Sequence, residues 1–370
     1  MGKEPIMQNI KKIVITGGPC AGKSTAMSWI RNAFAQRGYA VLIVPETATE
    51  LITGGVAPWT CGTNIDYQLC QVELQMTKER LFLQAAETMK EEKILIVCDR
   101  GVMDNKAYME AEEFGRVLSA LGANEVRSRD SYDAVFHLVT AANGAESFYS
   151  SANNSARYET VEQAVALDDR LLACWTGHKH LRVIDNSTDF EGKMRRLETE
   201  IAEFLGENHP YEMERKFLIA YPDIEWLEHN PLCRRVEIEQ VYLQSAKGEE
   251  LRIRRRGEGG NYIYYETRKR SIDGMKRIST ETRLTEEEYR RLLKSADPAR
   301  HPITKNRYCL NYDTQYFEID VYPFWQDRAI LEIEVADEAA EIHFPDQIRV
   351  LEEVTGDPSY KNAALAKMEV

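Results

Sequence analysis

The sequence has few of the features that mark secreted, membrane-spanning or nucleic-acid-binding proteins. Its seven cysteines are scattered and none belongs to a C-x-x-C pair, so we expect a reduced compartment and neither a disulfide framework nor a structural zinc site. No apolar run approaches the ~18 residues of a membrane-spanning helix, and the polar N-terminus is unlike a signal peptide. The formal net charge of -13 argues against nucleic acid as a partner. We therefore expect a cytoplasmic globular protein.

Internal repeats and low-complexity segments are also absent, and the chain of 370 residues exceeds the length of one typical core. The pattern changes near Gly206. Strand and helix patterns alternate before it, whereas strands with a period of two residues dominate after Pro210. We therefore predict two domains, residues 1–206 and residues 211–370.

The first domain is expected to be an α/β domain, a parallel sheet with flanking helices, because short apolar runs alternate with amphipathic stretches. The expected strands cover residues 13–16, 41–44, 94–98, 134–139 and 181–184. The expected helices cover residues 67–90, 161–175 and 191–205, besides one that follows Ser24. Such sheets bind ligands at the carboxyl ends of their strands, which is where the polar motifs of this region lie.

A phosphate-binding loop follows the first of these strands. Residues 17–24 read G-x-x-x-x-G-K-S and lead into an amphipathic helix. The glycines let backbone N–H groups point inward at a phosphate chain, Lys23 adds a positive charge, and Ser24 offers a hydroxyl to Mg²⁺. The motif therefore predicts a nucleoside triphosphate with Mg²⁺ as the ligand. The expected nucleotide-binding residues of this loop are Gly17, Gly18, Pro19, Ala21, Gly22, Lys23, Ser24 and Thr25.

Charged side chains near other strand ends are candidates for the same site. Glu46 follows the second strand, where a carboxylate can accept a proton from a hydroxyl group. Asp99 ends the third strand and is a candidate Mg²⁺ ligand, and Arg100 beside it is a candidate clamp for a phosphoryl group. Arg157 and Arg170 are candidate lid arginines that bind the nucleotide and neutralise transition-state charge.

Taken together, the loop, the Pro-Glu and Asp-Arg strand ends and the later arginines resemble P-loop kinases of the nucleoside and nicotinamide riboside kinase kind, over residues 10–205. The resemblance implies catalytic roles for Glu46 as a base and for Arg100 as a phosphate clamp, and Asp99 is a further catalytic candidate from its place at the end of the third strand. It leaves open whether the domain transfers a phosphoryl group, only hydrolyses a nucleotide, or uses it as a switch. The guanine-reading pattern N-K-x-D is absent, which favours ATP over GTP.

Charged side chains alternate along the expected strands of the second domain, which predicts an antiparallel sheet of the α+β class. Glu212, Glu214 and Lys216 share one side of a strand, and the arginines at 252, 254 and 256 do the same. A helix is expected over residues 285–294 with Thr285 as its N-cap, and another at the C-terminus. The charged face is either solvated, or it lines a barrel whose lumen holds water or a polyphosphate with divalent metal.

The strand motifs resemble the triphosphate tunnel metalloenzyme (CYTH) family over nearly all of residues 211–370. They run in order from E-x-E-x-K at 212–216 through L-R-I-R at 251–254, T-R-K at 267–269, K-N-R-Y at 305–308, F-E-I-D-V at 317–321 and L-E-I-E at 331–334 to Y-K-N at 360–362. The resemblance implies an antiparallel β-barrel, the triphosphate tunnel, in which Mg²⁺ or Mn²⁺ assists the attack of water on a phosphoanhydride.

The same resemblance implies roles for individual residues. It implies that the triphosphate is bound by Lys216, Arg252, Arg254, Lys269, Lys305 and Arg307. It implies that metal is bound by Glu212, Glu214, Glu281, Asp320, Glu332 and Glu334. Glu212, Glu214 and Lys216 are also implied as catalytic. Ser279 departs from the family, whose hydrolases often carry a second carboxylate two residues before Glu281, and this departure favours slow turnover or binding alone.

Three hypotheses for the whole chain follow. The leading one is a nucleotide-binding module joined to a metal-dependent enzyme that converts a triphosphate-containing small molecule and water to diphosphate and phosphate. The layout also resembles eukaryotic GTP-binding proteins of membrane trafficking, in which the tunnel domain binds phosphoinositide head groups; the acidic net charge counts against this hypothesis. The third hypothesis is a small-molecule kinase with a regulatory tunnel. The sequence contains no signal for an oligomeric state.

Overall fold

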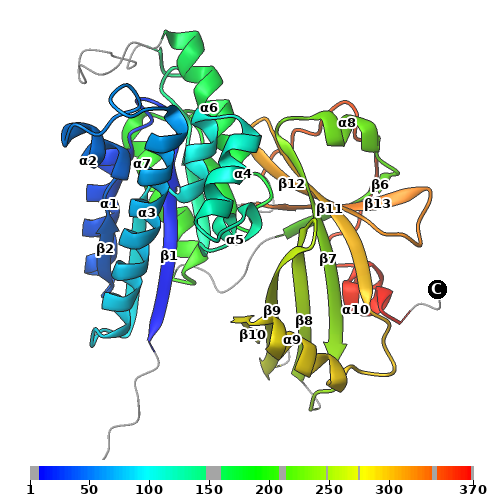
Figure 1. Cartoon of the computed structure of the whole chain (residues 1–370). Helices are drawn as coiled ribbons and strands as arrows, with labels where there is room; N and C mark the ends of the chain where they lie inside the picture. The colour runs from blue at the N-terminus through cyan, green and yellow to red at the C-terminus, as the bar shows by residue number, and fades with distance from the viewer. Residues whose placement is uncertain are drawn as a thin grey trace, which may run out of the picture. The chain divides into compact units, whose positions relative to one another are not determined.

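The computed structural model describes residues 8–146, 160–207, 214–246, 249–273, 276–335 and 340–367, with the side chains of residues 270–279 excepted. The chain divides into two compact units, Met1–Glu212 and Met213–Val370 (Figure 1). Each unit has its own sheet and its own core.

A five-stranded sheet forms the centre of the first unit, with the strand order β2-β3-β1-β4-β5. All of its neighbouring strands pair in parallel, which confirms the predicted α/β class. The strands are β1 (Asn9–Thr16), β2 (Ala40–Val44), β3 (Lys93–Asp99), β4 (Ala134–Leu138) and β5 (Leu181–Ile184). Because the strands are parallel, the ends of β1, β2 and β3 lie at one edge of the sheet, where Gly17, Glu46 and Asp99 are found.

Helices surround this sheet (Figure 1). They are α1 (Lys23–Gln36), α2 (Thr47–Thr53), α3 (Asn64–Glu87), the 3₁₀ helix η1 (Val102–Tyr108), α4 (Ala111–Ala120), α5 (Glu125–Arg129), α6 (Val161–Trp175) and α7 (Phe190–Phe204). The helices α1, α3, α6 and α7 agree with the predictions within a few residues. The sequence patterns did not reveal the shorter α2, η1, α4 and α5.

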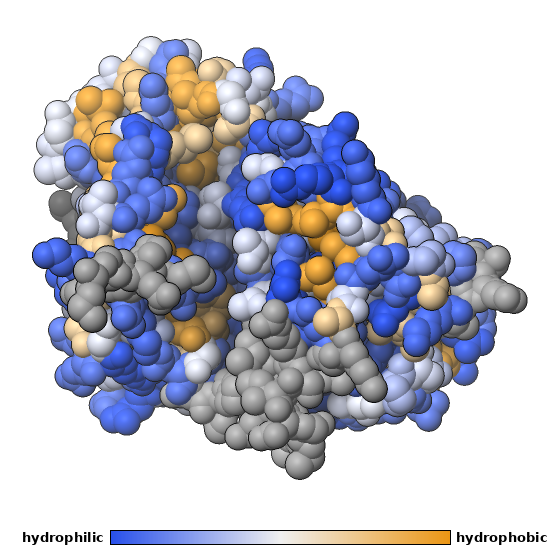
Figure 2. Space-filling view, turned by 90° about the horizontal axis from the view of Figure 1, so that it is seen from below, coloured by the Kyte–Doolittle hydropathy of each residue, from blue (hydrophilic) through white to orange (hydrophobic). Residues whose placement is uncertain are grey.

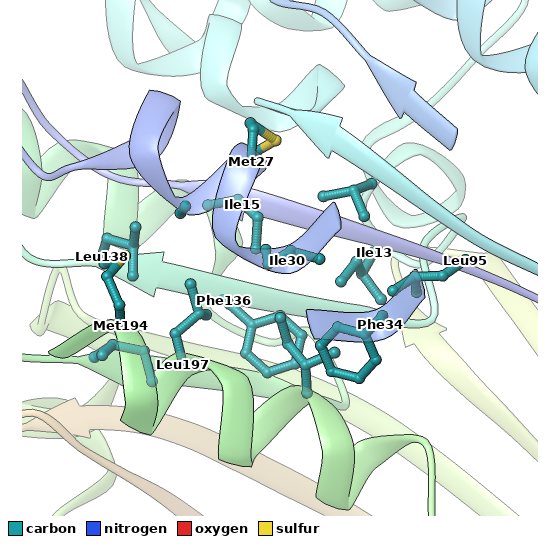
Figure 3. Packing of buried hydrophobic residues seen from close by; sticks show 14 of the residues in the cluster. Ile13, Ile15, Met27, Ile30, Phe34, Leu95, Phe136, Leu138, Met194 and Leu197 are labelled. Atoms are coloured by element: carbon teal, nitrogen blue, oxygen red, sulfur yellow. The ribbon is translucent and has the colours of Figure 1, made fainter. Parts of the chain in front are cut away.

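The core of the first unit lies between the sheet, α1 and α7 (Figure 3). Its side chains are fully or almost fully buried, and each contributes about 1.5–3 kcal/mol through removal from water. They include Ile13 and Ile15 of β1, Leu95 of β3, Phe136 and Leu138 of β4, Met27, Ile30 and Phe34 of α1, and Met194 and Leu197 of α7. This packing holds β1 and α1, and therefore the loop between them, in a fixed position.

A nine-stranded sheet forms the centre of the second unit, with the strand order β10-β9-β8-β7-β11-β12-β13-β6-β14. Every neighbouring pair is antiparallel, as predicted. The strands are β6 (Glu214–Ala220), β7 (Cys233–Leu243), β8 (Glu249–Glu258), β9 (Asn261–Asp273), β10 (Lys276–Leu284), β11 (Ile303–Tyr312), β12 (Gln315–Val321), β13 (Arg328–Glu334) and β14 (Val350–Glu353). Within the described part of the chain, no strand ladder joins the outer strands β10 and β14.

Short helices cover this sheet on both faces. On the apolar face, Leu227 of α8 (Ile224–His229) packs with Phe217 and Leu331, and Tyr289 of α9 (Glu286–Leu292) packs with Ile253. The side chain of Thr285 accepts a hydrogen bond from the backbone N–H of Glu288, which confirms Thr285 as an N-cap. On the opposite face, α10 (Asn362–Leu365) covers one end of the sheet, where Leu365 packs with Tyr242, Ile303 and Ile330.

The outer surface is mainly hydrophilic, and its apolar residues lie in separate patches in the view of Figure 2. Of the helices in the described ranges, none combines the length and the apolar composition that crossing a bilayer requires.

Candidate functional site

The loop after β1 has the curled backbone that its glycines predict. Gly17 has φ 135°, Gly22 has φ 93°, and Cys20 lies in the left-handed region at φ 56°. A Cβ on Gly17 would lie 2.0 Å from the carbonyl oxygen of Leu138. Gly17 is therefore required both by its φ and by the close approach of β4.

Lys23 lies at the first position of α1 and reaches back over the loop. Its Nζ donates hydrogen bonds to the carbonyl oxygens of Gly17 (2.8 Å) and Gly18 (2.9 Å). Burial, and then the positive charge of Arg100, lower the pKa of Lys23 to about 8. Ser24 and Thr25 are exposed in the same turn. The positive end of α1 and this ammonium group therefore lie together, as an anion site requires.

Glu46 and Arg100, predicted separately, are bonded to each other. The Nε of Arg100 donates a hydrogen bond of 2.6 Å to Oε1 of Glu46. Burial alone would raise the pKa of Glu46, but Arg100 holds it below its ordinary value. Glu46 is therefore an anion that is paired with Arg100 through Oε1, while its Oε2 accepts a hydrogen bond from Thr49. Arg100 Nη1 is buried and has no hydrogen-bond partner among the described residues.

Asp99 ends β3 next to this pair. Burial, followed by the charge of Glu46, raises the pKa of Asp99 to about 6. Its Oδ1 is also buried without a hydrogen-bond partner in the described part of the chain. A carboxylate in this state gains from a cation, so Asp99 fits the predicted role of a Mg²⁺ ligand.

Asp168 of α6 is a residue of this site that the sequence patterns did not reveal. Its Oδ1 accepts a hydrogen bond of 2.5 Å from the backbone N–H of Gly18, and its Oδ2 accepts one of 3.1 Å from Thr140. His137 Nε2 lies 3.2 Å from the same carboxylate. Asp168 thus ties α6 to the phosphate-binding loop. Of the two predicted lid arginines, Arg170 is exposed on α6, and Arg157 lies outside the described residues.

In the second unit, strand register places the predicted ionic residues on one face of the sheet. Directly paired residues of antiparallel strands share a face. On β6 and β13, Lys216 pairs with Glu332 and Glu214 with Glu334. The same face continues through Glu318 paired with Glu332, Asp320 with Arg307, Lys305 with Ile238, and Ile238 with Arg256. On β8, Arg254 is paired with Gln240 of β7 and Tyr265 of β9, and Arg252 is paired with Tyr242 of β7 and Thr267 of β9. The face ends on β10, where Glu281 is paired with Thr267 and Ser279 with Lys269. We call this surface the ionic face.

One half of the ionic face is a buried network of ion pairs. Arg307 donates from Nη2 to Glu332 at 2.7 Å and from Nε to Asp320 at 2.7 Å, and it also bonds Glu318. Lys216 Nζ lies 2.6 Å from Glu332, and Lys305 bonds Asp320. Burial alone would raise the pKa of Glu332, but Arg307 and the two lysines hold it well below its ordinary value. Glu332 is therefore ionised, and Glu318, Asp320 and Glu332 are each already paired with a cation.

The predicted metal ligands are not gathered into one cluster. Among the described residues, no group of three or more histidine, cysteine or acidic side chains is placed to hold a metal ion. Asp320 and Glu332 are bonded to cations, and Glu281 lies on β10, where it accepts a 2.9 Å hydrogen bond from Arg254. Glu334 is exposed, and Glu212 lies outside the described residues. Glu214 is exposed, and its Oε1 already lies 3.3 Å from Nζ of Lys216.

The other half of the ionic face carries donors without partners. Four buried atoms have no hydrogen-bond partner among the described residues, namely Nε of Arg252, Nε of Arg254, Nε2 of Gln240 and Oγ1 of Thr267. We call these four residues the donor patch. Buried N–H groups without an acceptor are costly, so the patch is suited to an anion.

Comparison with known proteins agrees with this geometry. A family model described as a CYTH domain matches residues 210–356. An inorganic triphosphatase of Nitrosomonas europaea is 33% identical over 159 residues, which cover 42% of this chain and 96% of that protein. The chain belongs to the CYTH family.

Residues 12–193 match a family model described as an AAA domain. The CYTH region is joined to a P-loop region, as the motifs predicted, and the kinase acceptor stays a prediction. A crystal structure of the inorganic triphosphatase NE1496 is 29% identical, covers 43% of this chain and 96% of that chain, and gives a TM-score of 0.31. A protein from Pyrococcus horikoshii, PH1012, is 18% identical, covers 34% of this chain and 80% of that chain, and gives a TM-score of 0.25.

Proposed function

We propose that the CYTH unit is a metal-dependent triphosphatase that hydrolyses a short linear triphosphate to diphosphate and phosphate. The observation that carries the proposal is the ionic face, where buried arginine donors without partners lie beside a paired network of lysine, arginine and carboxylates. The related protein from N. europaea is an inorganic triphosphatase, which supports inorganic triphosphate as the substrate.

On the ionic face, the cationic side chains bind phosphate and the carboxylates bind metal. Arg252, Arg254 and Lys269 bind the phosphate chain from β8 and β9, and Lys216, Lys305 and Arg307 bind it from β6 and β11. When phosphate oxygens bind Lys216 and Arg307, the carboxylates that are paired with these two cations become available to bind metal. Glu214, Glu332 and Glu334, with Glu212, are the oxygen ligands suited to Mg²⁺ or Mn²⁺. The bound metal supplies charge neutralisation and orients the attacking water.

For the first unit we propose binding of a nucleoside triphosphate with Mg²⁺, with ATP favoured and GTP as the alternative. Lys23, the loop amides and Arg100 form the anion site; Nη1 of Arg100 lies 3.9 Å from Oδ1 of Asp104 and has no hydrogen-bond partner among the described residues. Asp99 and Ser24 are the proposed Mg²⁺ ligands. Arg100 moves from Glu46 to the phosphate when nucleotide binds. Glu46 is then free to accept a proton from an acceptor hydroxyl, which would make this unit a kinase.

Phosphate release from inorganic triphosphate with Mn²⁺ or Mg²⁺ tests the proposal on the full chain. Glu214→Gln should lower the rate by roughly 10²-fold or more, because a metal ligand is lost. Lys23→Ala should leave it unchanged, since it alters only the first unit. Glu225→Gln, on the exposed side of α8, is the matched control for Glu214→Gln.

The outcomes separate the hypotheses. Loss of activity only in Lys23→Ala would place turnover in the first unit and contradict the proposal. No release from any triphosphate, together with binding to phosphoinositide vesicles, would favour the trafficking hypothesis instead. A transfer of ³²P from ATP to a small-molecule acceptor that is lost in Lys23→Ala would establish the kinase.

A further inference from the structure

The donor patch contains two neutral side chains without a predicted role, of which Thr267 begins the T-R-K motif at 267–269. Gln240 lies on β7 and Thr267 on β9, and their exposed fractions are 4% and 3%. Gln240 lies directly opposite Arg254, and Thr267 lies directly opposite Arg252. Because Arg252 and Arg254 are two residues apart on β8, all four side chains lie on the ionic face in two adjacent rows.

The unpaired state of these neutral groups needs a physical explanation. A buried amide or hydroxyl without a partner is destabilising, so valine at position 267 would give a more stable fold than threonine. Nothing in the fold uses Nε2 of Gln240 or Oγ1 of Thr267 among the described residues. These two groups are therefore suited to bind a ligand of the folded unit.

The chemistry of the patch limits that guest. An amide N–H, a hydroxyl and two guanidinium N–H groups can all donate, so the complementary surface is rich in acceptors. An ionised phosphoryl group presents acceptors only, whereas a nucleobase or a sugar hydroxyl also presents donors. Arg254 is held in place by its bond to Glu281, so its Nε keeps its direction when the guest arrives.

We propose that Gln240 and Thr267 are substrate-binding residues that donate hydrogen bonds to one phosphoryl group of the triphosphate chain, beside Nε of Arg252 and Arg254. This inference rests on the proposed function of the CYTH unit. The two side chains bind without adding positive charge. They therefore fix the position of the chain where further cations would repel Arg252 and Arg254.

Two near-isosteric variants of the full chain test this assignment, Thr267→Val and Gln240→Met. Each should weaken the binding of inorganic triphosphate, measured by calorimetry, by roughly 10-fold, which corresponds to about 1.4 kcal/mol. All proteins carry Lys23→Ala, so that the P-loop does not bind the probe. The thermal midpoint of each ligand-free variant should equal or exceed that of its parent, because an unpaired buried polar group is removed. Thr304→Val, on the exposed opposite face of β11, is the control and should leave the affinity unchanged.

The stability measurement separates a binding role from a structural one. Weaker binding without loss of stability supports the proposal. Unchanged affinity in both variants, or weaker binding accompanied by a lower thermal midpoint of the free protein, would overturn it. If the parent protein itself does not bind triphosphate, the proposed function fails and this inference fails with it. Binding by the parent with unchanged affinity in the variants overturns this inference alone.

Discussion

Arg307 should be the side chain on which the stability of the second unit depends most. Arg307 is 9% exposed, and its guanidinium bonds three carboxylates, those of Glu318, Asp320 and Glu332. In Arg307→Met a side chain of similar length remains, but these carboxylates lose their shared cation. Removing one partner of a buried ion pair typically costs about 3–5 kcal/mol, so we expect a loss of this size at neutral pH.

The pH dependence of this loss follows from the pKa of Glu332. Its pKa is depressed in the folded protein, so its ion pairs stabilise the fold above the ordinary glutamate pKa of about 4.3 and are lost as the pH falls. In Arg307→Met the effect of burial on Glu332 is less opposed, its pKa rises, and it protonates at a higher pH. The difference in stability between the two proteins should therefore be fully present above about pH 4.3 and shrink as the pH falls below that value.

Hydrogen exchange of the backbone amides in β11, β12 and β13 measures this effect in the second unit alone. A loss of 3–5 kcal/mol corresponds to a decrease in protection of roughly 10²–10⁴-fold. Arg255→Met is the matched control, because Arg255 pairs with Glu239 on the more exposed opposite face, where such a pair contributes about 0–1 kcal/mol. A loss in Arg307→Met that is no larger than in this control, or one that does not shrink below the ordinary glutamate pKa of about 4.3, would refute the reasoning.

Three further predictions concern the first unit. Gly17→Ala should abolish nucleotide binding and lower the thermal midpoint, because its Cβ would lie 2.0 Å from the carbonyl oxygen of Leu138 at a φ of 135°. Asp168→Asn should weaken nucleotide binding, measured by calorimetry, by roughly 10-fold, because a hydrogen bond from Gly18 to a charged acceptor contributes about 1.5–3 kcal/mol. Asp99→Asn should stabilise the nucleotide-free unit above pH 6, since the raised pKa of Asp99 means that its ionisation opposes folding, and the gain should vanish below pH 4.

Two of these predictions have a control variant within the same unit, and the third is checked by its pH dependence. Gly115→Ala lies in α4 with nothing within 4 Å of an added Cβ, and it should leave nucleotide binding intact. Asp169→Asn changes the exposed neighbour of Asp168 and should not weaken binding. Equal effects of Asp168→Asn and Asp169→Asn would show that charge alone, and not the bond to the loop, matters. A stabilisation by Asp99→Asn that persists below pH 4 would contradict the assigned pKa.

The sequence predicted the elements whose signals are local. The loop from Gly17 to Ser24 was recognisable because its glycine spacing, its preceding strand and its following helix are all within one short segment. The shared face of Lys216 and Glu214, or of Arg252 and Arg254, follows from the period of two residues in any strand. Glu318, which the prediction left out, could have been found by the same period, since it lies two residues before Asp320.

Only the tertiary structure decided which of these residues meet. Glu46 and Arg100 are 54 positions apart, and Asp168 is 150 positions from Gly18, so no local pattern could pair them. Gln240 and Thr267 are neutral, so the alternation of charged residues does not point to them. Strand register brings them beside the arginines. The amino-acid sequence by itself determined the two classes of sheet and the residue types of each site, because periodicity and turn chemistry act over a few residues. The partners of each charge were decided by strand pairing and helix packing, because hydrogen bonds and ion pairs form between neighbours in space and not between neighbours in the chain.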